Sequence, residues 1–410
     1  MLETVAAYWT RKHEELAFLA GAARTELRRV STGNALWHEK QRLRAALQSR
    51  VIGERPQLTE SQLHANPPPD DELPQLAWAY QRFDLRVRTR RFFETVYPLD
   101  VRGGISLGVW AASGMGVITA TLRTLHDTLR APRRILFADD AYFETRKLLS
   151  RLERFLPNAD DDALLPGDFF YLDSVTDADH FPRLAAHASL AALQLVLFDT
   201  TCYDVGSPLI DRVVARCRAE NVPLLCLRSH LKIDCLATEY ARLGSAALLL
   251  PPRPSRTLVA FAQTLRFGIF YELATAGAMA NPTAFLPFAQ DPSFRALNAR
   301  RNARMVEATA YLDERLSARL GTQVIVPHHG CYLILRRSNP TEHRAADLLA
   351  TLVTKLSAAG LEARPAPSFG YDLVGLTLLR RQGMLVRIAV PDLPDDDLDR
   401  LAEIITREMS

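Results

Sequence analysis

The sequence predicts an α/β fold, in which a large domain has a mostly parallel sheet sandwiched by helices and a smaller α+β domain follows at the C-terminal end. Short apolar runs alternate with helical patterns through the middle of the chain, and this alternation favours parallel strands joined by right-handed crossovers. A breaker cluster at residues 64–74, HANPPPDDELP, separates the first helical residues from this region. The expected domains are an N-terminal helical segment over 1–94, the large domain over 95–285 and the small domain over 286–410.

The elements of the first two domains follow from periodicity. Residues 1–50 are amphipathic and rich in Arg and Glu, as expected for helices. In the large domain, the apolar runs that predict strands are residues 135–138, 195–198, 223–227 and 246–250. The helical patterns between these runs are residues 116–129, 145–155 and 209–220. A strand, a helix and the next strand therefore repeat along this region.

The small domain begins with a long helical pattern at 294–320 that contains neither Pro nor Gly. Behind it come strand-like residues 324–336, a helix near 341–359, strand-like residues 385–390 and a final helix near 394–408. This order of β and α segments differs from the alternation upstream. It predicts an α+β domain that closes the chain.

Composition indicates a globular protein without a nucleic-acid or membrane partner. The chain has 50 basic and 47 acidic residues, a net charge of +3, and 48% hydrophobic residues. Its five cysteines form no CxxC pair, which is typical of reduced thiols in the cytoplasm. The first residues carry acids and lack the apolar core of a signal peptide, so we expect a cytoplasmic protein. The adjacent His328 and His329 lack the neighbouring acids or cysteines of a metal site, and we expect a polar turn and no metal.

Lysine is rare in this sequence. Only five of the 50 basic residues are lysines, and an arginine does not form a Schiff base under ordinary conditions. The five lysines are Lys12, Lys40, Lys147, Lys232 and Lys355. Of these, Lys232 has the most suggestive context, because it lies just after the predicted strand at 223–227 in the string CLRSHLK.

An acid and a lysine follow two successive predicted strands. Asp199 directly follows the apolar run 195–198. A carboxylate at this position can pair with the protonated ring nitrogen of a cofactor, or it can simply cap a βα loop. Lys232 follows the next strand, where it is either a nucleophile activated by burial and nearby charge or a solvated loop lysine. The upstream acid favours the first interpretation of Lys232.

A short run of small residues opens a predicted helix upstream of both. Residues 112–116 read ASGMG, so Ser113, Gly114 and Met115 let backbone N–H groups approach a phosphate at a helix N-terminus. The same Ser-Gly pair is also common as a helix cap. The string is not a GxGxxG dinucleotide fingerprint.

Along the chain, the small-residue run at 112–116 comes first, Asp199 second and Lys232 third. In this order the three motifs resemble those of the fold-type I enzymes that depend on pyridoxal phosphate (PLP), the aminotransferase superfamily, and the resemblance covers residues 95–410. The resemblance implies that PLP forms a Schiff base with Lys232, that Asp199 bonds its pyridine nitrogen, and that Ser113, Gly114 and Met115 hold its phosphate. Ser229 and Lys232 fit the Ser-x-x-Lys pattern of these enzymes. The resemblance also implies a homodimer with the site near its interface.

Four further residues take roles only from this resemblance. Tyr142 would stack on the cofactor ring, with Phe143 as the alternate, and Tyr203 would bond the phenolic oxygen of the cofactor. Arg242 would pair with the cofactor phosphate, and Arg387 would bind the substrate carboxylate. The other interpretations are packing beside the next helix for Tyr142, a solvent salt bridge for Arg242 and a solvent-facing strand edge for Arg387.

The function that the resemblance implies is a PLP enzyme acting on an amino acid through a Schiff base with the cofactor. The strings at 242–244 and 368–370, together with Arg387, favour an aminotransferase, including one of specialised biosynthesis. The alternative is an enzyme of β/γ-elimination or γ-substitution, because residues 113–115 also resemble the cystathionine-synthase branch. Further alternatives are a regulator or binding protein with this fold and no turnover, or a nucleotide-binding α/β protein.

Overall fold

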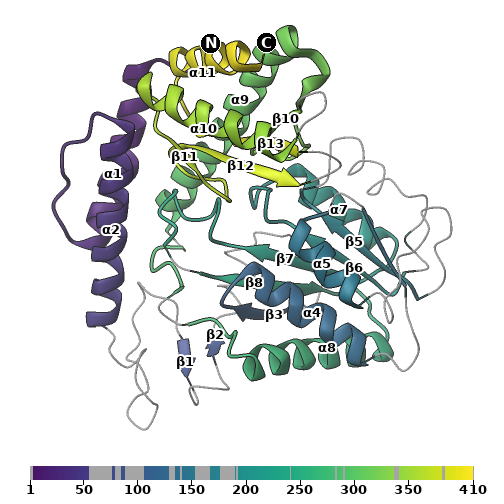
Figure 1. Cartoon of the computed structure of the whole chain (residues 1–410). Helices are drawn as coiled ribbons and strands as arrows, with labels where there is room; N and C mark the ends of the chain where they lie inside the picture. The colour runs from purple at the N-terminus through teal and green to yellow at the C-terminus, as the bar shows by residue number, and fades with distance from the viewer. Residues whose placement is uncertain are drawn as a thin grey trace. The chain divides into compact units, whose positions relative to one another are not determined.

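The computed structural model of the chain divides into two compact units (Figure 1). The residues that it describes are 3–54, 76–78, 85–87, 106–128, 134–138, 141–152, 167–175, 190, 193–240, 242–281, 284–289, 291–336, 341–380 and 384–409. We call Val51–Leu231 with Tyr240–Asp291 the sheet unit, and Met1–Arg50, Lys232–Glu239 and Pro292–Ser410 the lysine unit. The domain boundary expected after residue 94 lies outside the described residues, and that after residue 285 stays a prediction.

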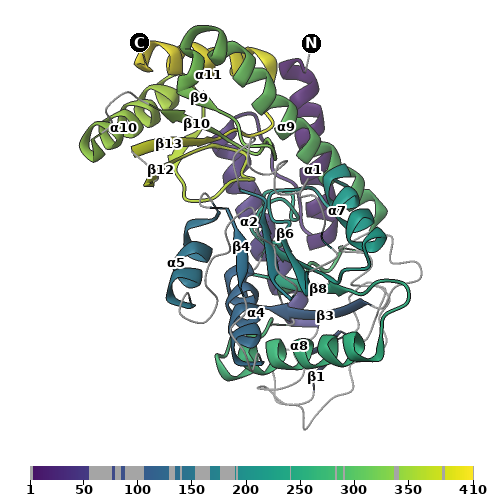
Figure 2. The ribbon, with the colours of Figure 1, turned by 90° about the vertical axis from the view of Figure 1, so that its right-hand side faces the viewer.

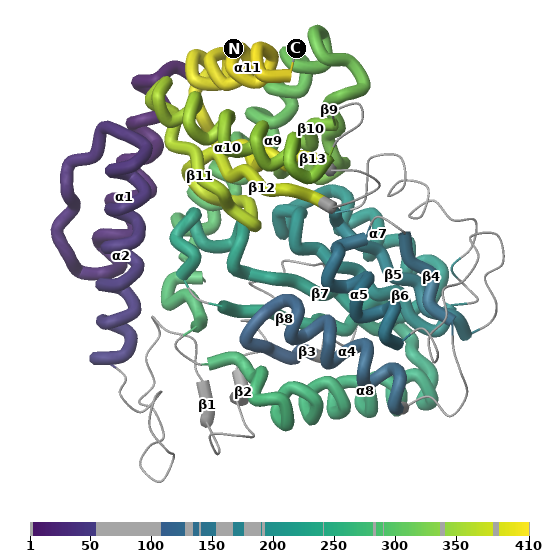
Figure 3. The backbone as a smooth tube through the Cα atoms, viewed as in Figure 1, coloured from purple at the N-terminus to yellow at the C-terminus, as the bar shows by residue number. Residues whose placement is uncertain are grey.

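A six-stranded sheet in the order β3-β8-β7-β6-β5-β4 forms the sheet unit (Figure 3). Its strands are β3 (Ser106–Ala111), β4 (Ile135–Phe137), β5 (Phe169–Asp173), β6 (Leu195–Asp199), β7 (Leu224–Ser229) and β8 (Gly244–Leu249). Strands β4 to β7 pair in parallel, whereas β8 is antiparallel to both of its neighbours, β7 and β3. The mostly parallel sheet expected from the sequence is therefore confirmed. A separate hairpin pairs β1 (Leu76–Trp78) with β2 (Leu85–Val87).

Helices cover both faces of this sheet (Figure 2). They are α4 (Gly114–Thr128), α5 (Phe143–Leu152), α7 (Pro208–Ala219) and α8 (Arg256–Thr275). Buried residues of α7 pack in one hydrophobic cluster with Val196 and Phe198 of β6. Buried residues of α4, α5 and α8 pack in another cluster with Leu195 and Leu197 of the same strand. Because both faces are covered, β6 is continuously apolar from Leu195 to Phe198.

The lysine unit is an α+β structure with a five-stranded sheet in the order β11-β12-β13-β10-β9. Its strands are β9 (Val324–Ile325), β10 (Leu333–Arg336), β11 (Ala363–Pro365), β12 (Val374–Arg380) and β13 (Met384–Ala389). Its helices are α1 (Val5–Ala23), most of α2 (Gly33–Glu54), α9 (Pro292–Leu320), the 3-10 turn η4 (Gly321–Gln323), α10 (Glu342–Ala358) and α11 (Asp395–Met409). A core of leucines from α9, α10 and α11 packs on the sheet, which confirms the expected α+β order.

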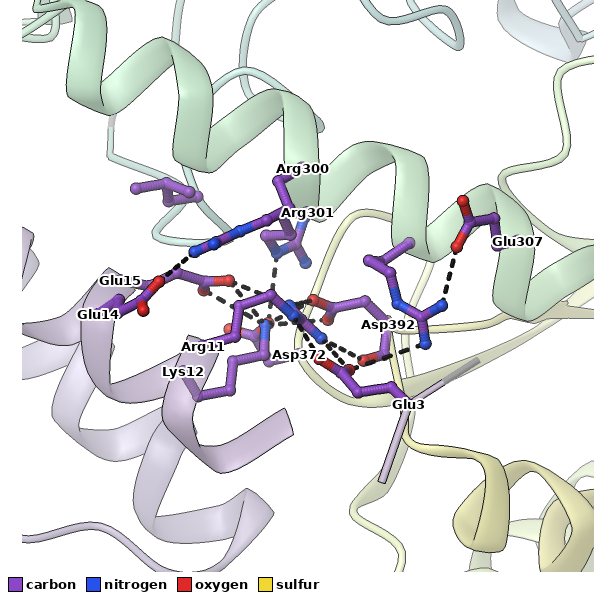
Figure 4. A network of polar contacts seen from close by, with 12 residues as sticks. Glu3, Arg11, Lys12, Glu14, Glu15, Arg300, Arg301, Glu307, Asp372 and Asp392 are labelled. Carbon is purple, nitrogen blue, oxygen red and sulfur yellow. Dashed lines mark hydrogen bonds and ion pairs between the residues drawn. The ribbon is translucent and has the colours of Figure 1, made fainter. Parts of the chain in front are cut away.

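The N-terminal helices belong to the lysine unit because a buried ion-pair network holds them there (Figure 4). Lys12 of α1 is fully buried, and its Nζ lies 2.7 Å from Asp372 and 2.8 Å from Asp392. Lys40 of α2 contacts Asp372 at 2.5 Å and Glu15 of α1 at 2.7 Å. The expected segment 1–94 thus begins as two helices whose buried charges are paired with acids far along the chain.

Candidate active site

Several of the predicted cofactor residues of the sheet unit lie at the carboxyl ends of its parallel strands. Parallel strands place their carboxyl ends together, and ligands of such sheets bind outside that edge. Asp173 ends β5 directly opposite Asp199, the last residue of β6. Ser229 ends β7 opposite Gly244, and Gly244 in turn pairs with Ala111 at the end of β3. Asp199 pairs with Leu227 of β7, so Ser229 lies two residues beyond it at the same carboxyl end of the sheet.

The loop between β3 and α4 lies in tight contact with this edge. A Cβ on Gly244 would lie 2.2 Å from the carbonyl oxygen of Ser113, and a Cβ on Gly114 would lie 2.7 Å from the Cβ of Ser229. These distances are far below normal contact, so only glycine fits at either position. The backbone of Ser113 and Gly114 is thereby held between β7 and β8 at the first turn of α4.

Ser113 also caps the first turn of helix α4, the alternative that the Ser-Gly pair in the sequence left open. Its Oγ accepts a hydrogen bond of 2.9 Å from the backbone N–H of Gly116, which satisfies one donor of the first turn. Met115 is half-buried, and its sulfur lies 3.8 Å from the hydroxyl of Thr145. The N-terminus of α4 is thus a fixed turn with backbone donors and a positive dipole end, which suits a phosphate.

Two buried carboxylates stand at the strand ends. Asp199 is 6% exposed, and its Oδ1 accepts a 2.9 Å bond from the N–H of Thr201. Asp173 accepts 2.9 Å and 3.0 Å bonds from the N–H groups of Tyr142 and Val175. Asp173, which the sequence reasoning did not single out, therefore fixes the backbone of Tyr142 at the same edge. Tyr142 is half-buried and its ring contacts that of Phe143, 47% exposed, in an edge arrangement at 5.0 Å.

Tyr203 and Arg242 lie in different surroundings from the other predicted residues. The ring of Tyr203 is buried in the core of the sheet unit, 6.1 Å from the ring of Phe198. Arg242 is exposed, two residues before β8. The sequence reasoning missed Arg228, which is fully buried on β7 and donates to the carbonyl oxygens of Thr200 and Tyr203 at 2.6 Å and 2.7 Å. It stabilises the loop that follows Asp199.

The turn that leads from β7 toward Lys232 is anchored at His230. Its Nε2 lies 2.7 Å from the hydroxyl of Ser245, and its backbone N–H donates to the carbonyl of Leu243 at 2.9 Å. Its ring also packs on Trp110 at 5.5 Å. Nothing in the string SHLK indicated this role, because the partners are on β3 and β8.

In the lysine unit, the loop carrying Phe369 and Gly370 packs closely on Lys232. The Nζ of Lys232 lies 4.6 Å from the centroid of the Phe369 ring, a cation–π contact. Gly370 has a φ of +85°, and a Cβ there would lie 2.4 Å from the carbonyl oxygen of Lys232. The amides of Asn298 and Asn302 both donate to the next carbonyl, that of Ile233, at 2.8 Å and 2.9 Å. The backbone around Lys232 is thus held from two sides.

The other lysines have clear roles in ion pairing or on the surface. Lys12 and Lys40 are buried among carboxylates, and Lys355 pairs on the surface with Glu408. Lys147 lies over the ring of Phe143, with Nζ 5.6 Å from its centroid. Lys232 alone among the five follows a strand end of the central sheet and is half-buried beside an aromatic ring.

Arg387 does not face solvent. It lies on β13, which is flanked by β12 and β10 rather than exposed as an edge, and it is 7% exposed. Its guanidinium carbon lies 5.1 Å from the centroid of the Tyr332 ring. Its Nη2 donates to the carbonyl of Ser368 at 3.2 Å. The interpretation of Arg387 as a solvent-facing residue is therefore wrong, whereas its role in substrate binding stays a prediction.

The expectation of a plain polar turn at the paired histidines is also wrong for one of them. His328 is exposed, but His329 is 4% exposed, and its ring lies 4.4 Å from that of Tyr332 and 6.4 Å from that of Phe369. Its Nδ1 accepts a 2.8 Å bond from the N–H of Cys331. The burial pattern of a turn is not visible in the sequence, since both histidines look alike there.

Comparison with known proteins shows the fold. No family model matches the sequence, and no curated protein matches it in sequence. A methionine gamma lyase from Micromonospora echinospora superposes with a TM-score of 0.52 at 16% identity, over 88% of this chain and 98% of that one. An aspartate aminotransferase from Giardia lamblia superposes with a TM-score of 0.53 at 12% identity, over 89% of this chain and 87% of that one. An aspartate aminotransferase from Saccharomyces cerevisiae superposes with a TM-score of 0.51 at 10% identity, over 88% of this chain and 87% of that one.

The chain has the fold of the fold-type I PLP enzymes. The resemblance predicted from the motifs is thus confirmed at the level of the fold. Among the described residues, no helix is both long and apolar enough to cross a membrane, and no three His, Cys, Asp or Glu side chains form a candidate metal site.

Proposed function

We propose that this protein binds PLP as a Schiff base on Lys232 and acts on an amino acid, as an aminotransferase. The observation that carries the proposal is the glycine-lined contact of Gly114 and Gly244 at the N-terminus of α4, beside the end of β7. That turn offers backbone donors to a phosphate group at the same sheet edge where Asp199 ends β6. The structures that share the fold include aspartate aminotransferases and a methionine gamma lyase.

Chain connectivity supports the choice of Lys232. It is the third residue after Ser229, the last residue of β7, and three residues span at most about 11 Å between Cα atoms. The lysine side chain adds further reach. Lys232 is therefore near the carboxyl edge for covalent reasons alone, which is where Asp199 and the α4 turn lie.

The proposed roles follow from the chemistry of each side chain. When bound, PLP supplies an electron sink for the bond that breaks at the α-carbon of the substrate. Asp199 would hold a proton on the ring nitrogen, and the turn at Ser113–Met115 with Ser229 would hold the phosphate. The Nζ of Lys232, released by the incoming amine, would accept the proton that leaves the α-carbon and deliver it to the carbon that keeps the amino group. Arg387 would orient the substrate carboxylate from β13.

The test begins with the visible absorbance of the purified protein titrated with PLP, for wild type, Lys232→Ala and the control Lys147→Ala. A band in wild type and in the control, absent from Lys232→Ala, supports the anchor. If wild type shows no band, or if Lys232→Ala still shows one, the assignment of Lys232 is wrong.

Turnover then distinguishes the reaction. Amino acids are screened with a 2-oxo acid as acceptor, and both oxo-acid and ammonia release are measured. Transfer of the amino group to the acceptor without ammonia supports an aminotransferase. Release of ammonia without an acceptor would overturn it in favour of the elimination chemistry that residues 113–115 also resemble.

A further inference from the structure

His329 is a buried hydrogen-bond donor for which the part of the chain that the structure describes offers no acceptor. The backbone N–H of Cys331 donates to its Nδ1 at 2.8 Å, so the proton of the neutral ring is on Nε2. No described residue accepts a hydrogen bond from that Nε2, although the side chain is only 4% exposed. Buried donors are nearly always paired, so an unpaired one calls for an explanation.

The ring of His329 carries a single proton across the physiological range. Burial, followed by the charges of Arg387, His328 and Lys232, lowers the pKa of His329 to about 3. The ring is therefore neutral at ordinary pH. Because Nδ1 faces its own turn, Nε2 lies on the opposite side of the ring, away from Cys331.

The surroundings of His329 combine aromatic faces with two cations. Its ring is stacked on that of Phe369, with an interplanar angle of 13°. The Nζ of Lys232 lies 4.6 Å from the centroid of the same Phe369 ring. The ring of Tyr332 is the other neighbour of His329, and the guanidinium carbon of Arg387 lies 5.1 Å from the centroid of that ring. The charges of Arg387 and Lys232 both act on His329. A neutral N–H donor near two cations complements an anion with more than one oxygen, because a partly buried carboxylate needs several donors.

We propose that His329 is a substrate-binding residue whose Nε2–H donates to the carboxylate of the amino-acid substrate. This inference rests on the proposed function, since it takes the substrate to be an amino acid bound beside Lys232. It gives the carboxylate a second, uncharged donor in addition to Arg387. It also explains why a histidine is buried in a turn with its second nitrogen unpaired.

Three variants separate this role from a structural one. His329→Asn keeps an acceptor at the position of Nδ1 for the N–H of Cys331, but has no donor near the position of Nε2. His329→Gln places an amide donor near Nε2 and gives up the contact at Nδ1. His329→Phe keeps the ring against Phe369 and Tyr332 and removes both polar atoms.

The first readout is binding without turnover. Protein labelled with ¹⁵N-histidine is titrated by NMR with propionate and with the uncharged propionamide, and the Nε2–H signal of His329 is assigned from its loss in His329→Phe. A saturable shift with propionate and not with propionamide is expected. An equal response to both, or to neither, would overturn the proposal.

The second readout is steady-state turnover of the best amino acid from the screen. Because a hydrogen bond to a charged group is lost, KM should rise roughly 10- to 100-fold in His329→Asn and His329→Phe, with kcat far less changed. His329→Gln should recover most of the loss. Recovery by Asn instead of Gln would show that His329 only holds its turn.

The two proposals fail in different ways. If wild type forms the PLP band and turns over amino acids while His329→Phe keeps its KM, the inference about His329 is wrong and the proposed function stands. If wild type forms no PLP band but propionate still shifts the Nε2–H signal, His329 binds carboxylates and the proposed function is wrong.

Discussion

Replacing Gly244 by alanine tests how the phosphate turn is built. The added Cβ would lie 2.2 Å from the carbonyl oxygen of Ser113 and 2.6 Å from the nitrogen of Gly114. Normal contact is about 3.5 Å, so the turn has to move by about 1 Å. A shift of this size in a packed region costs roughly 1–3 kcal/mol in the free energy of unfolding. It also moves the backbone donors that we propose for the phosphate, so the affinity for PLP should fall roughly tenfold or more.

Two measurements on Gly244→Ala check this, namely urea unfolding and the PLP concentration that half-saturates the visible band. The matched control is Gly21→Ala in α1, where an added Cβ has no atom within 4 Å. The control should gain about 0.5–1 kcal/mol of stability and bind PLP like wild type. If Gly244→Ala is as stable as wild type and binds PLP equally well, the turn is not held as described.

Two further predictions concern the buried ion pairs of the lysine unit. Lys40→Met leaves Glu15 and Asp372 buried without this cation, so the free energy of unfolding in urea should fall by about 3–5 kcal/mol. The surface control Lys355→Met should lose at most about 1 kcal/mol, and equal losses would contradict the network. Burial raises the pKa of Asp392, but Lys12 and Arg11 outweigh it and lower the pKa to about 2. The unfolded chain then binds the proton more tightly, so stability should fall as pH is lowered from about 5 toward 2, and a flat profile would refute this.

Much of the fold was predictable because both faces of the central sheet are covered. The runs at 195–198 and 223–227 are continuously apolar for that reason, and they are found as β6 and β7. The run at β5, FFYLD, is equally buried but was not predicted, nor was β3 with its interior Gly108. Helix α8 was missed as well, because its sequence shows little separation of apolar and polar faces.

The candidate site was predictable only where a residue's role comes from its position after a strand. Asp199 and Ser229 are strand-end residues, and the structure places both at one sheet edge. Pairings across long separations could not be foreseen, such as that of Lys12 with Asp372. The burial of His329 likewise depends on Phe369, forty residues downstream, and a turn carries no periodicity that reports burial.

The most direct test of the central claim is borohydride reduction of the PLP-loaded protein, followed by digestion and mass spectrometry of the lysine-containing peptides. We predict a stable PLP adduct on Lys232, with the other lysines unmodified at stoichiometric PLP. We also predict no stable adduct in Lys232→Ala. An adduct on a different lysine in wild type, or an unchanged yield in Lys232→Ala, would contradict the assignment of Lys232 as the cofactor anchor.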